Sequence, residues 1–419
     1  MIIQSNLSKP AASPRTPSSL TAPTELVLDQ VAPTGLPADM TAIDRLREYA
    51  RQPLETTQPA LAKEFATRPP AESQWPTLDN IQSTLSQSAT NVPEKVRSGV
   101  GAEKADEYIR RQIGKFQQAQ AAKEGTTQLN RLVHREQLHG GAAEVHWNPN
   151  LNKLINLFDK ESMHSLVRIS DASGAANPDG KTMYGFALEV YNGDQPTDIL
   201  MTGGTYRSEA SQAKSPEAQL ALFNMMNPSS KIGGIGRILW EVGPLDGPKM
   251  LVDVARMRTS HESISDITAW SRAPFAVTGK DGKEYLVKMR VVPTRQPETG
   301  QASGDTTSAK LKSEFASKLK TGDARWSLDF QFMQPGENAE DPRQVWQGPW
   351  IAAAEVVLPK VTDEGEAQRL AAAAEGVQFS PWKGKEPYSQ SPDKNVLRPW
   401  GELNRGRLAA YQASANNRS

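Results

Sequence analysis

The chain has 419 residues, enough for one large domain with an extended tail, and it carries 48 basic and 48 acidic side chains. This balance gives no overall attraction to nucleic acid, which is therefore not expected as a partner. The absence of cysteine excludes disulfides, thiolate catalysis, iron–sulfur clusters and Cys-type zinc sites. Apolar runs are short and the N-terminus lacks a basic-then-apolar pattern, so we expect no membrane span and no secretory signal peptide.

The first 95 residues form a segment of distinct composition, which holds 12 of the 30 prolines among Ser, Thr, Ala and Gln. Such a segment buries too little apolar surface to offset its ordering entropy, so we interpret residues 1–95 as a disordered tail. Its first 24 residues contain no acid and resemble the export signals of bacterial type III effectors. The protein is therefore expected to be either cytoplasmic or exported by a non-classical, type III-like route.

Residues 98–128 predict one amphipathic helix. Its apolar side chains recur at intervals of three or four, at Ala105, Ile109, Ile113, Phe116 and Ala119. Beyond it the chain changes to short β-rich runs separated by Gly, Pro and Asp: AAEVHW, LVRIS, GFALEVY, DILMTGG, EYLVKMRVVP, RWSLDFQFM and WIAAAEVVL. Such runs indicate an antiparallel sheet or barrel. Residues 298–308 predict an exposed loop, and residues 400–418 a closing helix.

Three of the five histidines, His134, His139 and His146, lie close together in the sequence and raise the question of a zinc site. These histidines lack the HExxH spacing of a helical zinc site. The glycine pair after His139 indicates a turn into a strand, so the three rings need not converge on one point. We expect no zinc. The GGIGR run at residues 233–237 lacks the strand, helix and downstream acid of a dinucleotide site, and is interpreted as a turn.

Three separated segments resemble motifs of one protein family. They are Arg131-Leu-Val-His134 before a glycine pair, Val167-Arg168-Ile169-Ser170 with the later run YGFALEVY, and Gly406-Arg407-Leu408-Ala409-Ala410-Tyr411 with Arg418 after it. In order and spacing these resemble the haem catalase superfamily, and in particular its short, catalase-related peroxidase branch, which lacks the C-terminal helical region. The likeness covers most of residues 130–210 and the last 20 residues, with a looser likeness between them.

This resemblance implies an α+β fold built on a closed antiparallel β-barrel with flanking helices, over residues 96–419, with haem b between barrel and closing helix. It further implies a role for each matching side chain. Tyr411 would ligate the iron, His134 would be the distal acid and base beside Ser170, Arg407 would favour the phenolate, and Arg131, Arg168 and Arg418 would bind the cofactor. The assigned arginines agree with the chemistry of this cofactor, because an iron-bound phenolate and two propionates all need neighbouring cations.

The distal turn departs from the family pattern. Catalases carry an asparagine-rich turn after this strand, whereas DILMTGGT places Gly203 and Gly204 there, so no amide side chain is available and efficient disproportionation of hydrogen peroxide is in doubt. The expected function is a haem-dependent, peroxide-metabolising enzyme of catalase or peroxidase type, acting on a peroxide or small molecule. Two alternatives stay open: a haem-dependent isomerase, dehydratase or oxygenase, and an exported haem-binding effector. A homo-oligomer is also left open.

Overall fold

The structure is a computed structural model that describes residues 75–418 with several gaps. The residues within this span that it does not describe are Gln128, Asn130, Leu132, Asp159, 173–180, 193–194, 204–212, Lys214, 221–242, 244–246, 250–251, 253–257, Thr259, 298–299 and 383–396. The predicted export segment, the GGIGR run and Gly204 of the distal turn therefore lie outside the described residues.

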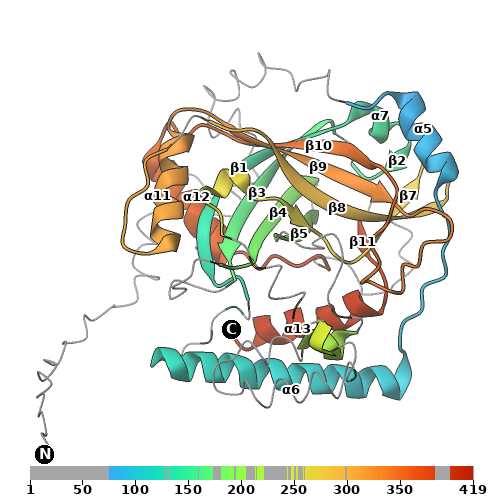
Figure 1. The fold of residues 1–419 in the computed structure, drawn as a ribbon, viewed down its shortest axis with the longest axis horizontal. Helices are drawn as coiled ribbons and strands as arrows, with labels where there is room; N and C mark the ends of the chain where they lie inside the picture. Colours follow the sequence, from blue (N-terminus) through green and yellow to red (C-terminus); the bar gives the residue numbers. More distant parts are fainter. Residues whose placement is uncertain are drawn as a thin grey trace, which may run out of the picture.

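Among the described residues, eight antiparallel strands close into a barrel (Figure 1). Each strand pairs with the next in the order β8, β6, β5, β4, β3, β1, β10 and β9, and β9 pairs back with β8. The strands are β1 (Glu136–Trp147), β3 (Ser162–Asp171), β4 (Tyr184–Asn192), β5 (Gln195–Gly203), β6 (Ala269–Trp270), β8 (Glu284–Arg295), β9 (Ala324–Phe332) and β10 (Trp350–Leu358). Closure gives every strand two neighbours, and the predicted closed antiparallel barrel is confirmed.

Alternation of side chains along the strands separates the barrel interior from its outer face. On β4, Phe186, Leu188 and Val190 belong to the main hydrophobic core, which fills the barrel. Gly185 and Ala187, which alternate with these residues, lie on the opposite face of the strand, and both line a cavity. The outer face of the barrel is therefore free to contribute to a site without disturbing the core.

Three short strands and two short helices complete the sheet and its connections. They are β2 (Ile155–Asn156), β7 (Phe275–Gly279), β11 (Arg398–Pro399), α7 (Pro149–Asn152) and the 3-10 helix η3 (Ile264–Asp266). Strand β7 pairs with β8 on one side and with β2 and β11 on the other. Since β11 leads directly into the last helix, this extension ties the end of the chain to the barrel.

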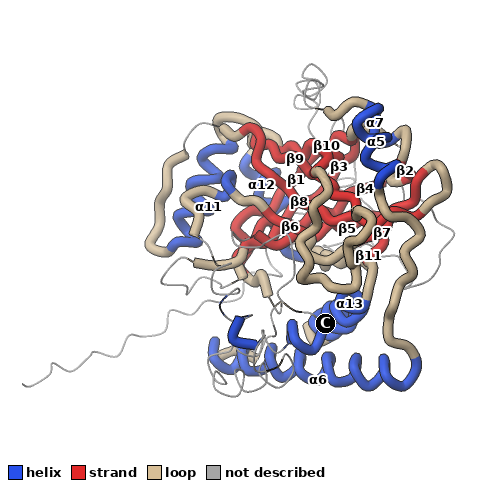
Figure 2. The backbone as a smooth tube through the Cα atoms, turned by 45° about the vertical axis from the view of Figure 1, so that its right-hand side comes forward, coloured by secondary structure: helices blue, strands red, loops and turns tan. Residues whose placement is uncertain are grey.

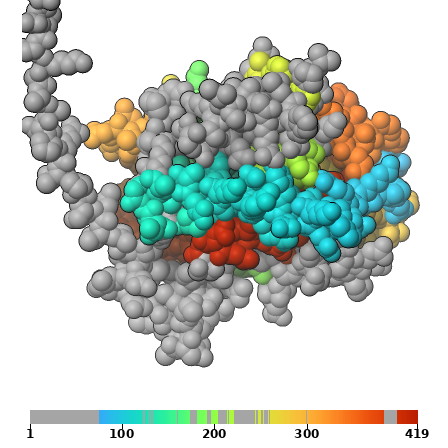
Figure 3. All heavy atoms as spheres, turned by 90° about the horizontal axis from the view of Figure 1, so that it is seen from below, coloured from blue at the N-terminus to red at the C-terminus, as the bar shows by residue number. Residues whose placement is uncertain are grey.

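In the described ranges, five longer helices flank the barrel: α5 (Leu78–Gln87), α6 (Gly99–Glu124), α11 (Thr307–Leu319), α12 (Glu364–Gly376) and α13 (Glu402–Asn416). Helices α11 and α12 pack against β1, whereas α6 and α13 pack against each other below the barrel (Figures 1 and 2). Viewed from below, α6 lies across α13 (Figure 3). Both helices predicted from the sequence, at residues 98–128 and 400–418, are confirmed.

The predicted disordered tail is wrong at its C-terminal end, because α5 belongs to the folded domain. Thr77 caps this helix by accepting a hydrogen bond from the Asn80 backbone N–H at 3.3 Å. Ile81 and Leu85, one helical turn apart, are buried in the main core. Two apolar residues in a polar, proline-rich context gave too weak a periodicity to reveal the helix.

Helix α13 is fixed to both of its neighbours by polar contacts. Asn404 is fully buried, and its Nδ2 donates to the backbone oxygens of Pro274 at 2.8 Å and Trp400 at 2.9 Å. Arg405, only 5% exposed, forms ion pairs with Glu402 on its own helix and with Asp106 on α6. These contacts define how α13 faces the barrel.

Candidate functional site

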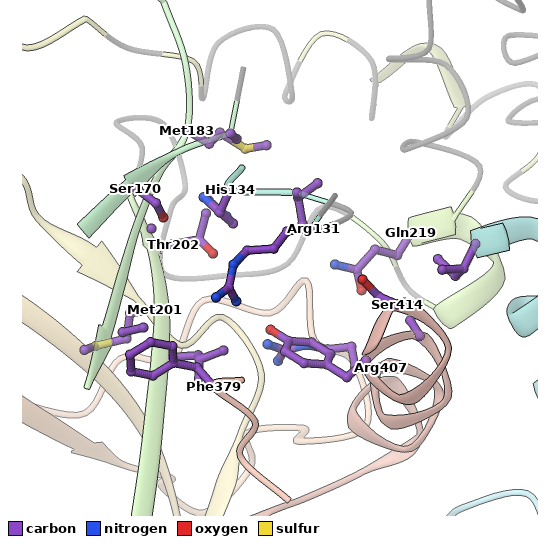
Figure 4. Close-up of a pocket in the computed structure, with 18 of the residues that line it drawn as sticks. Arg131, His134, Ser170, Met183, Met201, Thr202, Gln219, Phe379, Arg407 and Ser414 are labelled. Carbon is purple, nitrogen blue, oxygen red and sulfur yellow. The ribbon is translucent and has the colours of Figure 1, made fainter. Parts of the chain in front are cut away.

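A cavity of about 240 Å³ lies between the outer face of β3, β4 and β5 and helix α13. Its lining includes every residue that the family resemblance assigned to the haem site, namely Arg131, His134, Arg168, Ser170, Arg407, Tyr411 and Arg418. In Figure 4, His134 and Ser170 lie toward the strands, Arg407 and Ser414 lie on α13, and Arg131 reaches into the space between them. Residues nearly 290 positions apart in the sequence, Arg131 and Arg418, thus line one cavity.

The wall behind His134 is a row of small side chains across three strands. The register pairs Ser170 of β3 with Gly185 of β4, and Gly185 with Thr202 of β5. A Cβ atom on Gly185 would lie 2.5 Å from Ser170 Oγ and 2.8 Å from His134 Nδ1. Glycine at this position therefore allows the imidazole to lie directly against the barrel, beside the serine hydroxyl.

The backbone of His134 is held in an unusual conformation. Its φ is +57°, in the left-handed region that non-glycine residues rarely adopt, and its carbonyl accepts a hydrogen bond from Arg168 NH1 at 2.9 Å. Among the described residues, no group hydrogen-bonds to its buried Nδ1. Burial, followed by the positive charges of Arg168 and Arg272, lowers the pKa of His134 to about 3. The imidazole is therefore neutral at physiological pH.

Three guanidinium groups, those of Arg131, Arg168 and Arg418, line one part of the cavity. Arg168 is 4% exposed and pairs with Glu375 at 3.0 Å, and Arg131 pairs with the same carboxylate at 3.5 Å. Burial and the neighbouring charge of Arg168 lower the pKa of Arg131 to about 10, and burial also lowers that of Arg418. Two of these three cations pair with one half-exposed carboxylate, which leaves the arginine cluster well suited to bind further anions.

Tyr411 and Arg407 lie one turn apart on α13, both at the cavity. The Tyr411 ring packs edge-to-face against Trp382, with ring centroids 5.4 Å apart. Arg407 NH1 donates to Asn404 Oδ1 at 2.9 Å, and Asn404 is in turn bonded to the barrel. The orientation of Arg407 is thus set by a buried amide as well as by its helix.

Several residues at the cavity were not found by sequence reasoning. Arg272, in the left-handed region at φ +61°, donates to the backbone oxygens of Thr202 at 3.3 Å and Gly203 at 3.1 Å. Phe379 contributes an aromatic ring, and Glu375 contributes the carboxylate on two arginines. Arg272 lies in a stretch whose resemblance was noted only loosely, and Glu375 comes from a helix that was not predicted, so no local motif marked either of them.

Other possible sites raised by the sequence do not form in the described part of the chain. No group of three or more His, Cys, Asp or Glu side chains there could hold a metal ion. His139 packs edge-to-face on Phe315 at 5.0 Å, and His146 Nε2 lies 3.2 Å from Glu144 Oε2. The three neighbouring histidines thus go to separate environments. No helix in the described ranges is long and apolar enough to cross a membrane.

Comparisons with known proteins find catalases among solved structures. No protein-family model matches the sequence, and no curated protein matches it significantly. A fungal catalase is similar with 16% identity and a TM-score of 0.45, over 71% of this chain and 63% of that one. Catalase A from Saccharomyces cerevisiae is similar with 12% identity and a TM-score of 0.44, over 71% of this chain and 62% of that one. The chain thus spans less than two thirds of the length of either catalase, and the similarity concerns the fold.

Proposed function

We propose that this protein is a haem-dependent, peroxide-metabolising enzyme, with haem b bound in the cavity between the barrel and α13. One observation carries the proposal: a neutral histidine with an unused buried nitrogen, a phenol and five arginines all line this cavity. A structural core normally pairs its buried charges one to one, and this excess of arginines over carboxylates does not follow that pattern. Together these residues match the requirements of a dianionic iron porphyrin.

The charges of the site fit such a cofactor. Arg131, Arg168 and Arg418 carry three positive charges, and Glu375 offsets one, so this cluster of four side chains has a net charge of +2. The two propionates of haem b carry −2 in total and would bind these arginines by charge-assisted hydrogen bonds. With no cysteine in the chain, the axial ligand has to be Tyr, His or Met, and Tyr411 is the tyrosine at the cavity.

The protein side of the reaction is proton transfer at His134. When bound, haem supplies the redox chemistry of its iron, and an organic donor or a second peroxide supplies the two electrons. His134 accepts a proton from one peroxide oxygen and returns it to the other as the O–O bond breaks. Its lowered pKa, about 3, keeps the imidazole free to accept the proton and makes it release that proton readily. Ser170 Oγ and His134 Nδ1 both face Gly185 at the barrel wall, so Nε2 would be the atom that exchanges the proton.

The test is haem binding by the purified protein. The wild type should take up haemin and give the absorption spectrum of a high-spin ferric tyrosinate complex, and Tyr411→Phe should lose most of its haem because the anionic ligand is gone. The matched control is Tyr285→Phe. The Tyr285 hydroxyl donates to Asp281 Oδ2 at 2.8 Å, and Tyr285 does not line the cavity, so this variant should retain haem normally. A wild-type protein that fails to bind haemin, or a Tyr411→Phe variant that binds it equally well, would refute the proposal.

A further inference from the structure

Gly203 is the glycine of the distal turn that the structure describes, and the direction of its Cβ shows where a side chain at this position would lie. A Cβ on Gly203 would lie 3.0 Å from the backbone oxygen of Thr268 and 3.4 Å from Tyr184 Cβ. Tyr184 belongs to the barrel core, so position 203 faces the interior and an amide placed there would not enter the cavity. The resemblance pointed to Gly203 and Gly204 as the positions of the lost amide; the direction of the Gly203 Cβ contradicts this for Gly203, and Gly204 lies outside the described residues.

The neighbouring residue, Thr202, faces the cavity instead. Strand alternation places Thr202 on the outer face of β5, and the register sets it opposite Gly185, the residue against which His134 lies. Ser170 stands on the other side of the same glycine. In Figure 4, Thr202 lies beside His134 and its hydroxyl oxygen points toward the interior of the cavity. Two hydroxyls therefore flank the histidine, one from each neighbouring strand.

The position of Thr202 is fixed by its backbone. It pairs with Gly185 on one side and with Trp270 of β6 on the other. Its carbonyl, together with that of Gly203, also accepts a hydrogen bond from Arg272. Among the described residues, no hydrogen bond engages the Thr202 hydroxyl, so it is available to a ligand in the cavity. A β-branched side chain on a backbone held at three points keeps its hydroxyl in place without reorganisation.

We propose that Thr202 is a catalytic residue whose hydroxyl donates a hydrogen bond to the peroxide, taking the place of the amide that the distal turn lacks. The inference rests on the haem-dependent function proposed above. The hydroxyl complements His134, because the histidine moves the proton while the threonine holds the oxygen on which negative charge develops. Thr202 thus favours a small peroxide held under His134, close to the barrel wall.

Fluoride is the probe for this contact, because it binds ferric haem and can only accept hydrogen bonds. Full-length protein loaded with haemin would be titrated with fluoride, and binding followed by visible absorption, for the wild type, Thr202→Val and Thr202→Ser. Valine keeps the shape of the threonine side chain and removes its hydroxyl donor. The fluoride dissociation constant should therefore rise about two- to tenfold, which corresponds to the loss of one neutral hydrogen bond. Serine should restore affinity close to that of the wild type.

The matched control is Thr197→Val, because Thr197 is a buried threonine on the same strand outside the cavity lining. It should leave fluoride affinity unchanged, and haemin affinity should be unchanged in all three variants. Normal haemin binding by Thr202→Val together with wild-type fluoride affinity would overturn the role of Thr202 alone. Failure of the wild type to bind haemin would overturn the haem-dependent function, and this inference with it.

Discussion

The close approach of His134 to the barrel can be tested by adding a single methyl group at Gly185. In Gly185→Ala the new Cβ would lie 2.5 Å from Ser170 Oγ, 2.8 Å from His134 Nδ1 and 3.1 Å from His134 Cγ. The serine can rotate away, but two ring atoms of the histidine cannot both be avoided without moving the ring. Because His134 already has a strained backbone at φ +57°, its loop is the part expected to move.

The size of the effect follows from two opposing contributions. Overpacking of this kind costs about 1 to 3 kcal/mol, whereas replacing glycine by alanine recovers about 0.4 to 1 kcal/mol by restricting the unfolded chain. The free energy of unfolding should therefore fall by roughly 0.5 to 2 kcal/mol. Displacement of His134 should affect peroxide cleavage more, since a shift of about 1 Å in a reacting group costs on the order of a hundredfold in rate.

The assay is urea unfolding of the protein, combined with stopped-flow reaction of the haemin-loaded form with hydrogen peroxide. Gly114→Ala in α6 is the matched control, because its Cβ would meet only Asn417 Nδ2 at the end of α13, at 3.5 Å, which is an ordinary contact distance. This control should gain up to about 1 kcal/mol of stability from helix propensity and react normally. A Gly185→Ala variant with the stability and peroxide rate of the wild type would refute the close contact between Gly185 and His134.

Three further predictions concern the buried histidines, the C-terminus and the role of His134 in peroxide cleavage. Burial lowers the pKa of His134 to about 3 and that of His139 to about 4. Below about pH 6.5 the unfolded state therefore binds protons that the folded state does not. The free energy of unfolding should fall as the pH drops from about 6.5 toward 4, by up to about 1.4 kcal/mol per pH unit for each histidine. Urea titrations at pH 7 and pH 5 measure this, and a His139→Gln variant with an unchanged pH dependence would contradict it. Deleting Arg418 and Ser419 should weaken haem retention, because Arg418 lines the cavity, and unchanged transfer of haem to apomyoglobin would show that Arg418 contributes nothing. His134→Ala should keep haem, because Tyr411 is the proposed ligand, but lose most peroxide cleavage, because the acid and base is gone; stopped-flow mixing with hydrogen peroxide measures this, and cleavage at the wild-type rate would refute the role of His134.

The residues at the cavity were predictable from sequence because each lies in a short motif whose local structure is simple. Arg168 and Ser170 are two apart on β3, and strand alternation alone puts them on one face. Arg407 and Tyr411 are four apart on α13, which places them on one side of a helix. The β-rich runs predicted an antiparallel sheet or barrel, and the resemblance supplied the closure of the barrel and the order in which the motifs meet.

Elements whose stability comes from tertiary packing could not be predicted in the same way. Helix α5 offers only Ile81 and Leu85 as buried residues, and α12 offers Leu370 and two alanines as its buried apolar side chains. Neither pattern exceeds what a polar loop shows by chance, and both helices gain their stability from the barrel against which they pack. The positive φ of His134 was equally invisible, because it results from contacts such as the hydrogen bond from Arg168 and not from the identity of the residue.

The unpredicted helix α12 changes how the arginine cluster works. The sequence indicated Arg131, Arg168 and Arg418 as three separate partners for an anion, which would present a charge of +3. Helix α12 ends beside them, and Glu375 near its C-terminus pairs with Arg131 and Arg168, while Arg131 also donates to the backbone oxygens of Glu375 and Val377. An incoming anion therefore meets two arginines that α12 already orients, and binding it costs less side-chain entropy than binding to three free arginines would.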